Sequence, residues 1–237
     1  MIYLKIKNEL NKFADKKQAK NLQRYFKTGK GQYGEDDVFL GLRAAEIKLV
    51  ARKYYQTADL DIIQKLLHSV CHEDRVLALR ILTYKFPKAN ETEQKKIYNF
   101  YLKNTTRINN WDLVDLSAPN IVGRWLLNHD RKILYKLARS KNLWERRIAI
   151  ISTFTFIRAG QIEDTIKIAK ILLSDQHDLI HKAVGWMLRE VGKKNLPALE
   201  QFLKTHYYKI PRTMLRYAIE KFPEAKRKKY LKMPVQW

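Results

Sequence analysis

Cysteine, glycine and proline are scarce in this chain, whose 237 residues include 1 Cys, 8 Gly and 6 Pro. The single cysteine, Cys71, excludes a disulfide within the chain and favours a reducing compartment. Because turn-forming residues are few, we expect long regular elements with short connections, which favours helices. No apolar run is long enough to span a membrane, and the charged N-terminus lacks the apolar core of a signal peptide. These absences predict a cytoplasmic protein that does not enter a membrane.

Acidic residues are also few relative to basic ones, with 24 Asp and Glu against 47 Lys and Arg. The formal net charge of +23 attracts polyanions and repels a second copy of the chain. Nucleic acid is therefore the first candidate partner and an anionic membrane surface the second, and we expect a monomer.

Apolar residues recur at helical spacing along most of the chain. The runs at 76–82, 148–156 and 166–173 mix intervals of three and four residues, which is typical of a helix face. The segment 144–159 is rich in β-branched residues, but its length favours a helix over a strand. Short polar stretches at 104–106, 140–142, 174–176 and 193–195 are expected to separate the helices.

A repeat is visible where a cation precedes a small apolar segment, at Arg147, Lys182 and Arg216, with spacings of 35 and 34 residues. A period of this length with two helices in each repeat indicates an α-solenoid. We therefore predict an all-α, curved solenoid formed by residues 1–237 as a single domain, with a basic C-terminal tail at about 224–237. The recurring cations would line its concave surface in a row.

Two familiar spacings carry no chemistry here. The G-x-G-x-x-G pattern from Gly29 to Gly34 follows a predicted helix rather than a strand, so we interpret it as a loop between helices. The pairs His68 and His72, and His177 and His181, are each four residues apart, but a structural zinc site needs four ligands. We interpret these histidines as solvated or half-buried, and we predict no metal and no cofactor.

One segment combines an indole with a carboxylate on a single helix face, because Trp111 and Asp115 are four residues apart. Asn110 is the expected N-cap, and Asp112 in the first turn would interact with the helix dipole. Packing of Trp111 in the core explains part of this pattern, but an indole beside a carboxylate is unusual on so basic a chain.

Several motifs together resemble the HEAT-like-repeat DNA alkylation-repair glycosylases of the AlkD type, in the order and at about the spacing of that family. They span roughly residues 20 to 220 and comprise Arg24-Tyr25-Phe26-Lys27-Thr28-Gly29-Lys30-Gly31, Asp37-Val38-Phe39-Leu40-Gly41-Leu42-Arg43, Asn110-Trp111-Asp112-Leu113-Val114-Asp115, Trp144-Glu145-Arg146-Arg147 and Lys182-Ala183-Val184-Gly185-Trp186-Met187-Leu188-Arg189-Glu190. The resemblance implies a monofunctional glycosylase that excises N3- or N7-alkylated purines from double-stranded DNA without flipping the base.

The resemblance also implies a role for each matching residue. Asp115 matches the catalytic carboxylate, Trp111 the indole beside the sugar of the lesion, and Arg147 the arginine that completes the catalytic trio. Trp186 and Tyr25 match aromatic residues that flank the bound DNA. We further expect DNA contacts from the cation row and its neighbours, namely Lys182, Arg216 and Arg146.

The chemistry of these residue types agrees with the resemblance. A purine alkylated at N3 or N7 leaves as a neutral base, so the reaction needs no general acid for the leaving group. Cleavage builds oxocarbenium character on the sugar, which a carboxylate can stabilise while it orients a water molecule. An indole face adds a cation–π attraction, and an arginine can hold a phosphate through two hydrogen bonds.

Two other classes of function stay open. A non-catalytic helical-repeat scaffold could bind DNA or an acidic protein partner, although it would not need the trio of Trp111, Asp115 and Arg147. An RNA-binding repeat protein is disfavoured, because the regular pairs of base-reading side chains of a modular RNA code are missing. The basic run 226–229 could add affinity for DNA or form a solvated tail.

Overall fold

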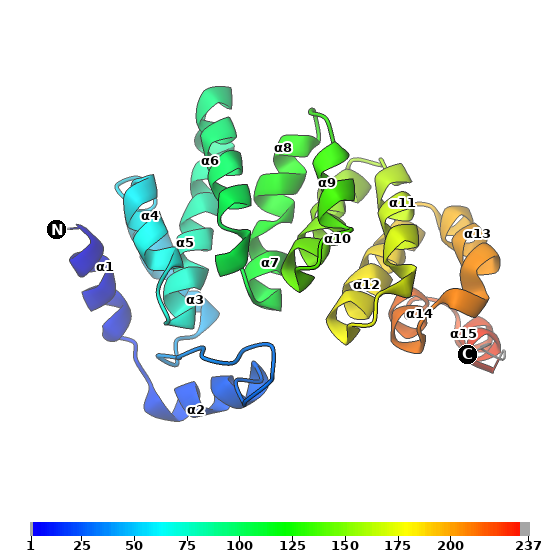
Figure 1. The fold of residues 1–237 in the computed structure, drawn as a ribbon, viewed down its shortest axis with the longest axis horizontal. Helices are drawn as coiled ribbons and strands as arrows, with labels where there is room; N and C mark the ends of the chain where they lie inside the picture. The colour runs from blue at the N-terminus through cyan, green and yellow to red at the C-terminus, as the bar shows by residue number, and fades with distance from the viewer. Residues whose placement is uncertain (1, 233–237) are drawn as a thin grey trace. The chain divides into compact units, whose positions relative to one another are not determined.

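The computed structural model describes residues 2–232, and all regular elements in this range are helical (Figure 1). The only β pairing in that range is an isolated bridge between Val38 and Cys71. The all-α class and the helical repeats predicted from the sequence are therefore confirmed. The helices form two compact units, which divide after Ile121.

The first unit contains seven α-helices among its described residues. They are α1 (Ile2–Asn11), α2 (Lys16–Tyr25), α3 (Ala44–Tyr54), α4 (Leu60–Leu67), α5 (His72–Lys85), α6 (Glu91–Lys103) and α7 (Trp111–Ser117). Short 3-10 turns follow α5 and α6 at Phe86–Lys88 and Thr105–Arg107. Helix α5 packs against α3, α4 and α7, so it is the central element of this unit.

A π-helical turn at Pro119–Gly123 includes the point of division, and the second unit continues after it with paired helices. They are α8 (Arg124–Leu126), α9 (Lys132–Leu137), α10 (Leu143–Arg158), α11 (Glu163–Ile171), α12 (Asp178–Lys194), α13 (Leu196–His206), α14 (Arg212–Ala218) and α15 (Glu224–Lys232), with 3-10 turns at Leu172–Ser174 and Tyr207–Lys209. Within this unit α10 packs against α12, and α12 packs against α14 (Figure 1). The predicted repeat therefore corresponds to successive helices of one layer.

The β-branched segment forms helix α10, as the sequence predicts. Ile148, Ile150 and Ile151 are fully buried on different sides of this helix, because α9, α11 and α12 all pack against it. A helix that is apolar on most sides needs neighbours on most sides, and this packing outweighs the weak helix propensity of isoleucine.

The loop between α2 and α3 is fixed to the rest of the first unit by a buried carboxylate. Glu73 Oε1 accepts hydrogen bonds from the backbone N–H of Gly41 at 2.8 Å and of Leu42 at 3.2 Å. Gly41 has a φ of +92°, and a Cβ at this position would lie 2.1 Å from the carbonyl oxygen of Asp15. Only glycine fits there, so this loop has a defined course.

Most of the predicted basic tail is helical. Residues 224–232 form α15, whose end is held by hydrogen bonds from the Arg212 guanidinium to the carbonyl oxygen of Leu231 and from the Tyr207 hydroxyl to that of Tyr230. The remainder of the predicted tail, residues 233–237, lies outside the described residues.

Candidate active site

Helix α7 starts at Trp111, and a buried asparagine holds this start in place. The side-chain oxygen of Asn110 accepts a hydrogen bond from the Trp111 backbone N–H at 2.8 Å, which confirms the predicted N-cap. The Asn110 amide also donates to Asp37 Oδ2 at 3.4 Å. The fully buried Asn110 therefore ties the first turn of α7 to the loop before α3.

The Trp111 indole lies in a cluster of aromatic rings. The Phe26 ring stacks on it with centroids 5.3 Å apart, and the Tyr25 ring meets it edge-on at 5.8 Å. Phe26 is buried, whereas 63% of Tyr25 is exposed. The structure thus brings together Tyr25 and Trp111, which the sequence analysis took from two different motifs. It also adds Phe26 to the site, a residue whose only signal in the sequence was its place next to Tyr25.

Asp115 lies one helical turn after Trp111 and is half-buried. Behind it, the Tyr101 hydroxyl is 2.9 Å from Ser117 Oγ in the core of the unit. Burial raises the pKa of Tyr101, and the negative charge of Asp115 raises it further. The carboxylate of Asp115 therefore has a neutral phenol, and not a second anion, on its buried side.

A buried imidazole connects the loop before α3 to the first turn of α7. His72 donates from Nδ1 to Asp37 Oδ2 at 3.0 Å and from Nε2 to Asp112 Oδ2 at 2.8 Å. His72 is only 2% exposed, so the prediction that it is solvated or half-buried was wrong. Asp112 does lie in the first turn of α7, but its role extends beyond the helix dipole, because it accepts this hydrogen bond.

The electrostatics of this network favour a charged imidazole. Burial lowers the pKa of His72, but the charge and hydrogen bond of Asp112 and those of Asp37 outweigh it and raise the pKa to about 9. Burial acts in the opposite direction on Asp37 and raises the pKa of its carboxyl. The hydrogen bond from His72 and the charge of Arg75 outweigh burial and lower this pKa below its ordinary value. At neutral pH the network is therefore carboxylate, imidazolium and carboxylate, with the Arg75 guanidinium on Asp37.

An aromatic pocket of about 210 Å³ opens beside this network, within the first unit. Its walls include the rings of Tyr25, Phe26 and Phe39, and its polar lining includes His72 and Asp112. The Phe39 ring stacks on the His72 imidazole with centroids 4.7 Å apart, so the same residues build the network and the pocket.

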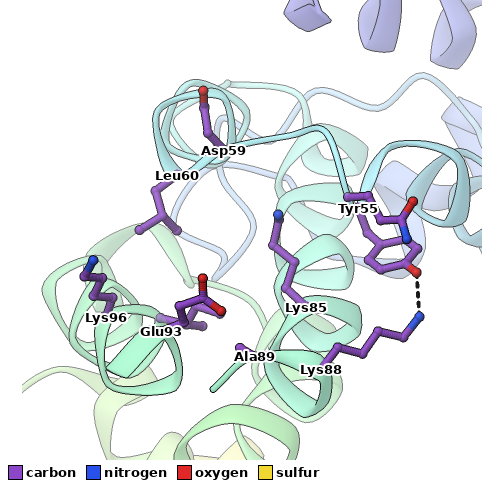
Figure 2. A pocket seen from close by; sticks show the side chains of 10 residues that line it. Tyr55, Asp59, Leu60, Lys85, Lys88, Ala89, Glu93 and Lys96 are labelled. Carbon is purple, nitrogen blue, oxygen red and sulfur yellow. Dashed lines mark hydrogen bonds between the residues drawn. The ribbon is translucent and has the colours of Figure 1, made fainter. Parts of the chain in front are cut away.

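Another pocket of the first unit, of about 430 Å³, lies between α4, α5 and α6 (Figure 2). Lys85, Lys88 and Lys96 line it together with Asp59 and Glu93, and the Lys88 ammonium lies on the Tyr55 ring and contacts its hydroxyl. None of the residues predicted for catalysis or DNA binding lines this pocket, so we do not assign it to the candidate site.

The second unit carries the predicted arginine on α10. Arg147 is 5% exposed, and its Nη1 donates to the carbonyl oxygen of Leu179. Arg146, the next residue back, donates from Nε to Asp175 Oδ2 at 2.6 Å and from Nη1 to the carbonyl oxygens of Ser140 and Lys141. Both guanidinium groups are thus partly used to join elements of this unit, and their contact with DNA stays a prediction.

The other predicted DNA contacts of the second unit lie on α12 and α14. Lys182 pairs with Asp178 at 2.7 Å and keeps 40% of its side chain exposed, and Arg216 is exposed. Trp186 is half-buried beside Phe154, with ring centroids 5.7 Å apart. Arg147, Lys182 and Arg216 lie on α10, α12 and α14, the alternate helices that pack one against the next, and their common orientation stays a prediction.

Neither a membrane segment nor a metal site is found in the part of the chain that the structure describes. No helix of residues 2–232 combines the length and the apolarity needed to cross a bilayer. Over the same residues, no three His, Cys, Asp or Glu side chains gather as metal ligands would.

The fold is similar to three solved structures at low sequence identity. A predicted DNA alkylation repair enzyme from Enterococcus faecalis has a TM-score of 0.69 and 17% identity, over 89% of this chain and 97% of that one. AlkD2 from Streptococcus mutans has a TM-score of 0.54 and 19% identity, over 88% and 99%. The protein smu.31 from Streptococcus mutans UA159 has a TM-score of 0.51 and 20% identity, over 81% and 92%.

Sequence comparisons point in the same direction. No curated protein matches the sequence. The model of the family described as DNA alkylation repair enzyme matches residues 6–222, which is most of the chain. The chain therefore belongs to the DNA alkylation repair enzyme family.

Proposed function

We propose that this protein is a monofunctional DNA glycosylase that hydrolyses the N-glycosidic bond of N3- and N7-alkylated purines in duplex DNA. One observation carries the proposal. The half-exposed Trp111 indole lies against the exposed Tyr25 ring, and Asp115 follows one turn later on the same short helix. The chain that carries this combination has a net charge of +23 and belongs to a DNA repair family, and both properties agree with DNA as the substrate.

The proposed chemistry needs only one carboxylate. An alkylated purine is cationic and leaves as a neutral base, so no general acid has to protonate it. Asp115 stabilises the oxocarbenium character that develops on the sugar and orients the attacking water. The Trp111 face contributes a cation–π attraction of about 0.5–2 kcal/mol to the same positive charge. The lesion stays in the duplex and is not flipped into a pocket.

Duplex DNA binding is proposed for residues of both units. Arg147 is the proposed phosphate ligand on α10, because a guanidinium can hold a phosphate through two hydrogen bonds. Lys182, Arg216 and Arg146 supply contacts to phosphates that are independent of sequence, and Tyr25 and Trp186 flank the DNA. The protein acts as a monomer in the cytoplasm, without a cofactor.

The direct test is release of base from methylated duplex DNA. Purified protein is incubated with DNA that carries N3-methyladenine and N7-methylguanine, and the free bases are separated by chromatography. The proposal predicts release of both bases, with DNA binding whose log K falls with log [salt] by about 0.9 per phosphate neutralised. Salt-dependent binding without base release would instead identify a non-catalytic scaffold.

A further inference from the structure

The buried His72 imidazole is connected to the Trp111 indole along two routes. Its Nε2 donates a hydrogen bond at 2.8 Å to Oδ2 of Asp112, the residue that follows Trp111 on α7. The Phe26 ring contacts both side chains, with its centroid 4.8 Å from that of His72 and 5.3 Å from that of Trp111. His72 therefore constrains both the first turn of α7 and the ring on which the indole packs.

His72 is itself held in one orientation. Its backbone N–H donates to the carbonyl oxygen of Val38 at 2.8 Å, and its ring stacks on Phe39 with centroids 4.7 Å apart. Its Nδ1 donates to Asp37 Oδ2 at 3.0 Å, and only 2% of the residue is exposed. A side chain that is fixed on this many sides can keep the residues it contacts in place, as the supporting residues of a preorganised site do.

The two carboxylates that accept from His72 differ in how far they depend on it. Asp37 also accepts hydrogen bonds from the Arg75 guanidinium and from the Asn110 amide. For the Asp112 side chain, His72 is the one hydrogen-bond partner among residues 2–232, and Oδ1 of this carboxylate is buried without a partner. The bond from Nε2 is therefore the one whose loss would free the Asp112 side chain at the start of α7.

We propose that His72 is a positioning residue, which acts through its Nε2 bond to Asp112 to hold the Trp111 indole toward the sugar of the lesion. The inference rests on the proposed function, because it takes the role of Trp111 from there. His72 is too buried to contact DNA, so its effect should fall on the rate of the chemical step and not on DNA affinity. The strength of an indole cation–π attraction limits this effect to about 30-fold.

Two substitutions separate the two ring nitrogens of His72. A glutamine places its amide NH₂ group near the position of Nε2, and an asparagine places it near the position of Nδ1. His72→Gln therefore keeps a donor to Asp112, whereas His72→Asn keeps a donor to Asp37 and loses the one to Asp112. Both variants lose the positive charge and the ring contacts with Phe26 and Phe39, so each is the matched control of the other for stability.

The rate of base release distinguishes the two variants. Single-turnover release of N7-methylguanine from duplex DNA is measured at saturating protein, at a temperature at which urea denaturation shows both variants to be folded. His72→Asn should release the base about tenfold more slowly than His72→Gln, and DNA affinity should be the same in both. A merely structural role of His72 would slow both variants equally, so equal rates would overturn the inference.

NMR tests the same point without DNA or catalysis. Contacts between the protons of the Trp111 indole and the Tyr25 ring, which meet edge-on in the structure, should persist in His72→Gln and weaken in His72→Asn. Asp112→Ala removes the acceptor instead of the donor and should weaken the same contacts. This variant decides the question if neither His72 variant folds, and unchanged contacts in it would contradict the inference.

The outcomes separate this inference from the proposed function. If the protein releases no base from DNA but the NMR contacts follow this pattern, His72 positions Trp111 and the glycosylase is wrong. If base is released while the two His72 variants have equal rates or equal contacts, the glycosylase stands and the positioning role of His72 is overturned.

Discussion

The two units of the protein use their charged side chains differently. In the first unit His72, Asp37 and Arg75 are all buried and form one connected network around the start of α7. In the second unit ion pairs such as Arg146 with Asp175 join one element to another and leave the arginine partly exposed. Buried pairs destabilise strongly when one partner is lost, whereas exposed pairs contribute little. The first unit is therefore the one in which a single substitution should change both stability and site geometry.

The largest effect on stability is expected from His72→Ala. This change leaves the carboxylates of Asp37 and Asp112 without their shared imidazolium, so the free energy of unfolding should fall by about 3–5 kcal/mol. Urea denaturation measures this loss of unfolding free energy. His68→Ala, at an exposed histidine four residues earlier, is the control, and its free energy of unfolding should fall much less. Equal losses in the two variants would erase the contrast between buried and exposed charges.

The pH dependence of stability sharpens the same contrast. The pKa of His72 is raised to about 9 in the folded protein. The contribution of His72 to the free energy of unfolding is therefore complete below the pKa of about 6.5 that histidine has in the unfolded chain, and it is lost as the pH rises through 9. The lowered pKa of Asp37 has the opposite sign, and its contribution is lost as the pH falls into the acid range. Unfolding free energy should thus decrease by about 3 kcal/mol between pH 6 and pH 10. His72→Gln should remove most of this slope, and an unchanged slope would contradict the network.

A smaller loss is expected from Asp112→Asn. The amide keeps the shape but removes the charge that faces the His72 imidazolium, so unfolding free energy should fall by about 1–3 kcal/mol. This replaces the expectation from the sequence, which limited Asp112 to a weak interaction with the helix dipole. Thermal melts at pH 7 measure the change. A loss within a few tenths of a kcal/mol would restore the helix-dipole interpretation.

The smallest effect on stability is expected in the second unit, from Lys182→Ala. Its partly exposed pair with Asp178 contributes about 0–1 kcal/mol, so the fold should hardly change. If Lys182 contacts a phosphate, the slope of log K against log [salt] for duplex DNA should fall by about 0.9. Lys167→Ala, at an exposed lysine on α11, should leave the slope unchanged. Equal slopes for both variants would remove Lys182 from the DNA contacts.

Sequence patterns predicted what depends on local spacing. The Asn110 cap, the helical turn from Trp111 to Asp115, and helix α10 all follow from intervals of at most a few residues or from apolar periodicity. The resemblance to a known family added Tyr25, which lies far from Trp111 in the sequence.

The buried network could not be predicted in this way. Asp37 and Asp112 lie 35 and 40 residues from His72, and no periodicity links positions that far apart. A cluster of charged residues at the start of α5 was the available signal, because it precedes an apolar run that had to be buried. The contacts of Phe26 with both His72 and Trp111 are likewise visible only in three dimensions.

The most direct test of the account is the single-turnover rate at which Asp115→Asn releases N7-methylguanine from duplex DNA. Loss of one preorganised charge should slow release on the order of 10²-fold or more, while DNA affinity is kept or slightly raised. Asp61→Asn, at an exposed aspartate on α4, should release the base at the unaltered rate. Release by Asp115→Asn at that same rate, with activity abolished instead by Asp112→Asn, would contradict the assignment of Asp115 as the catalytic carboxylate.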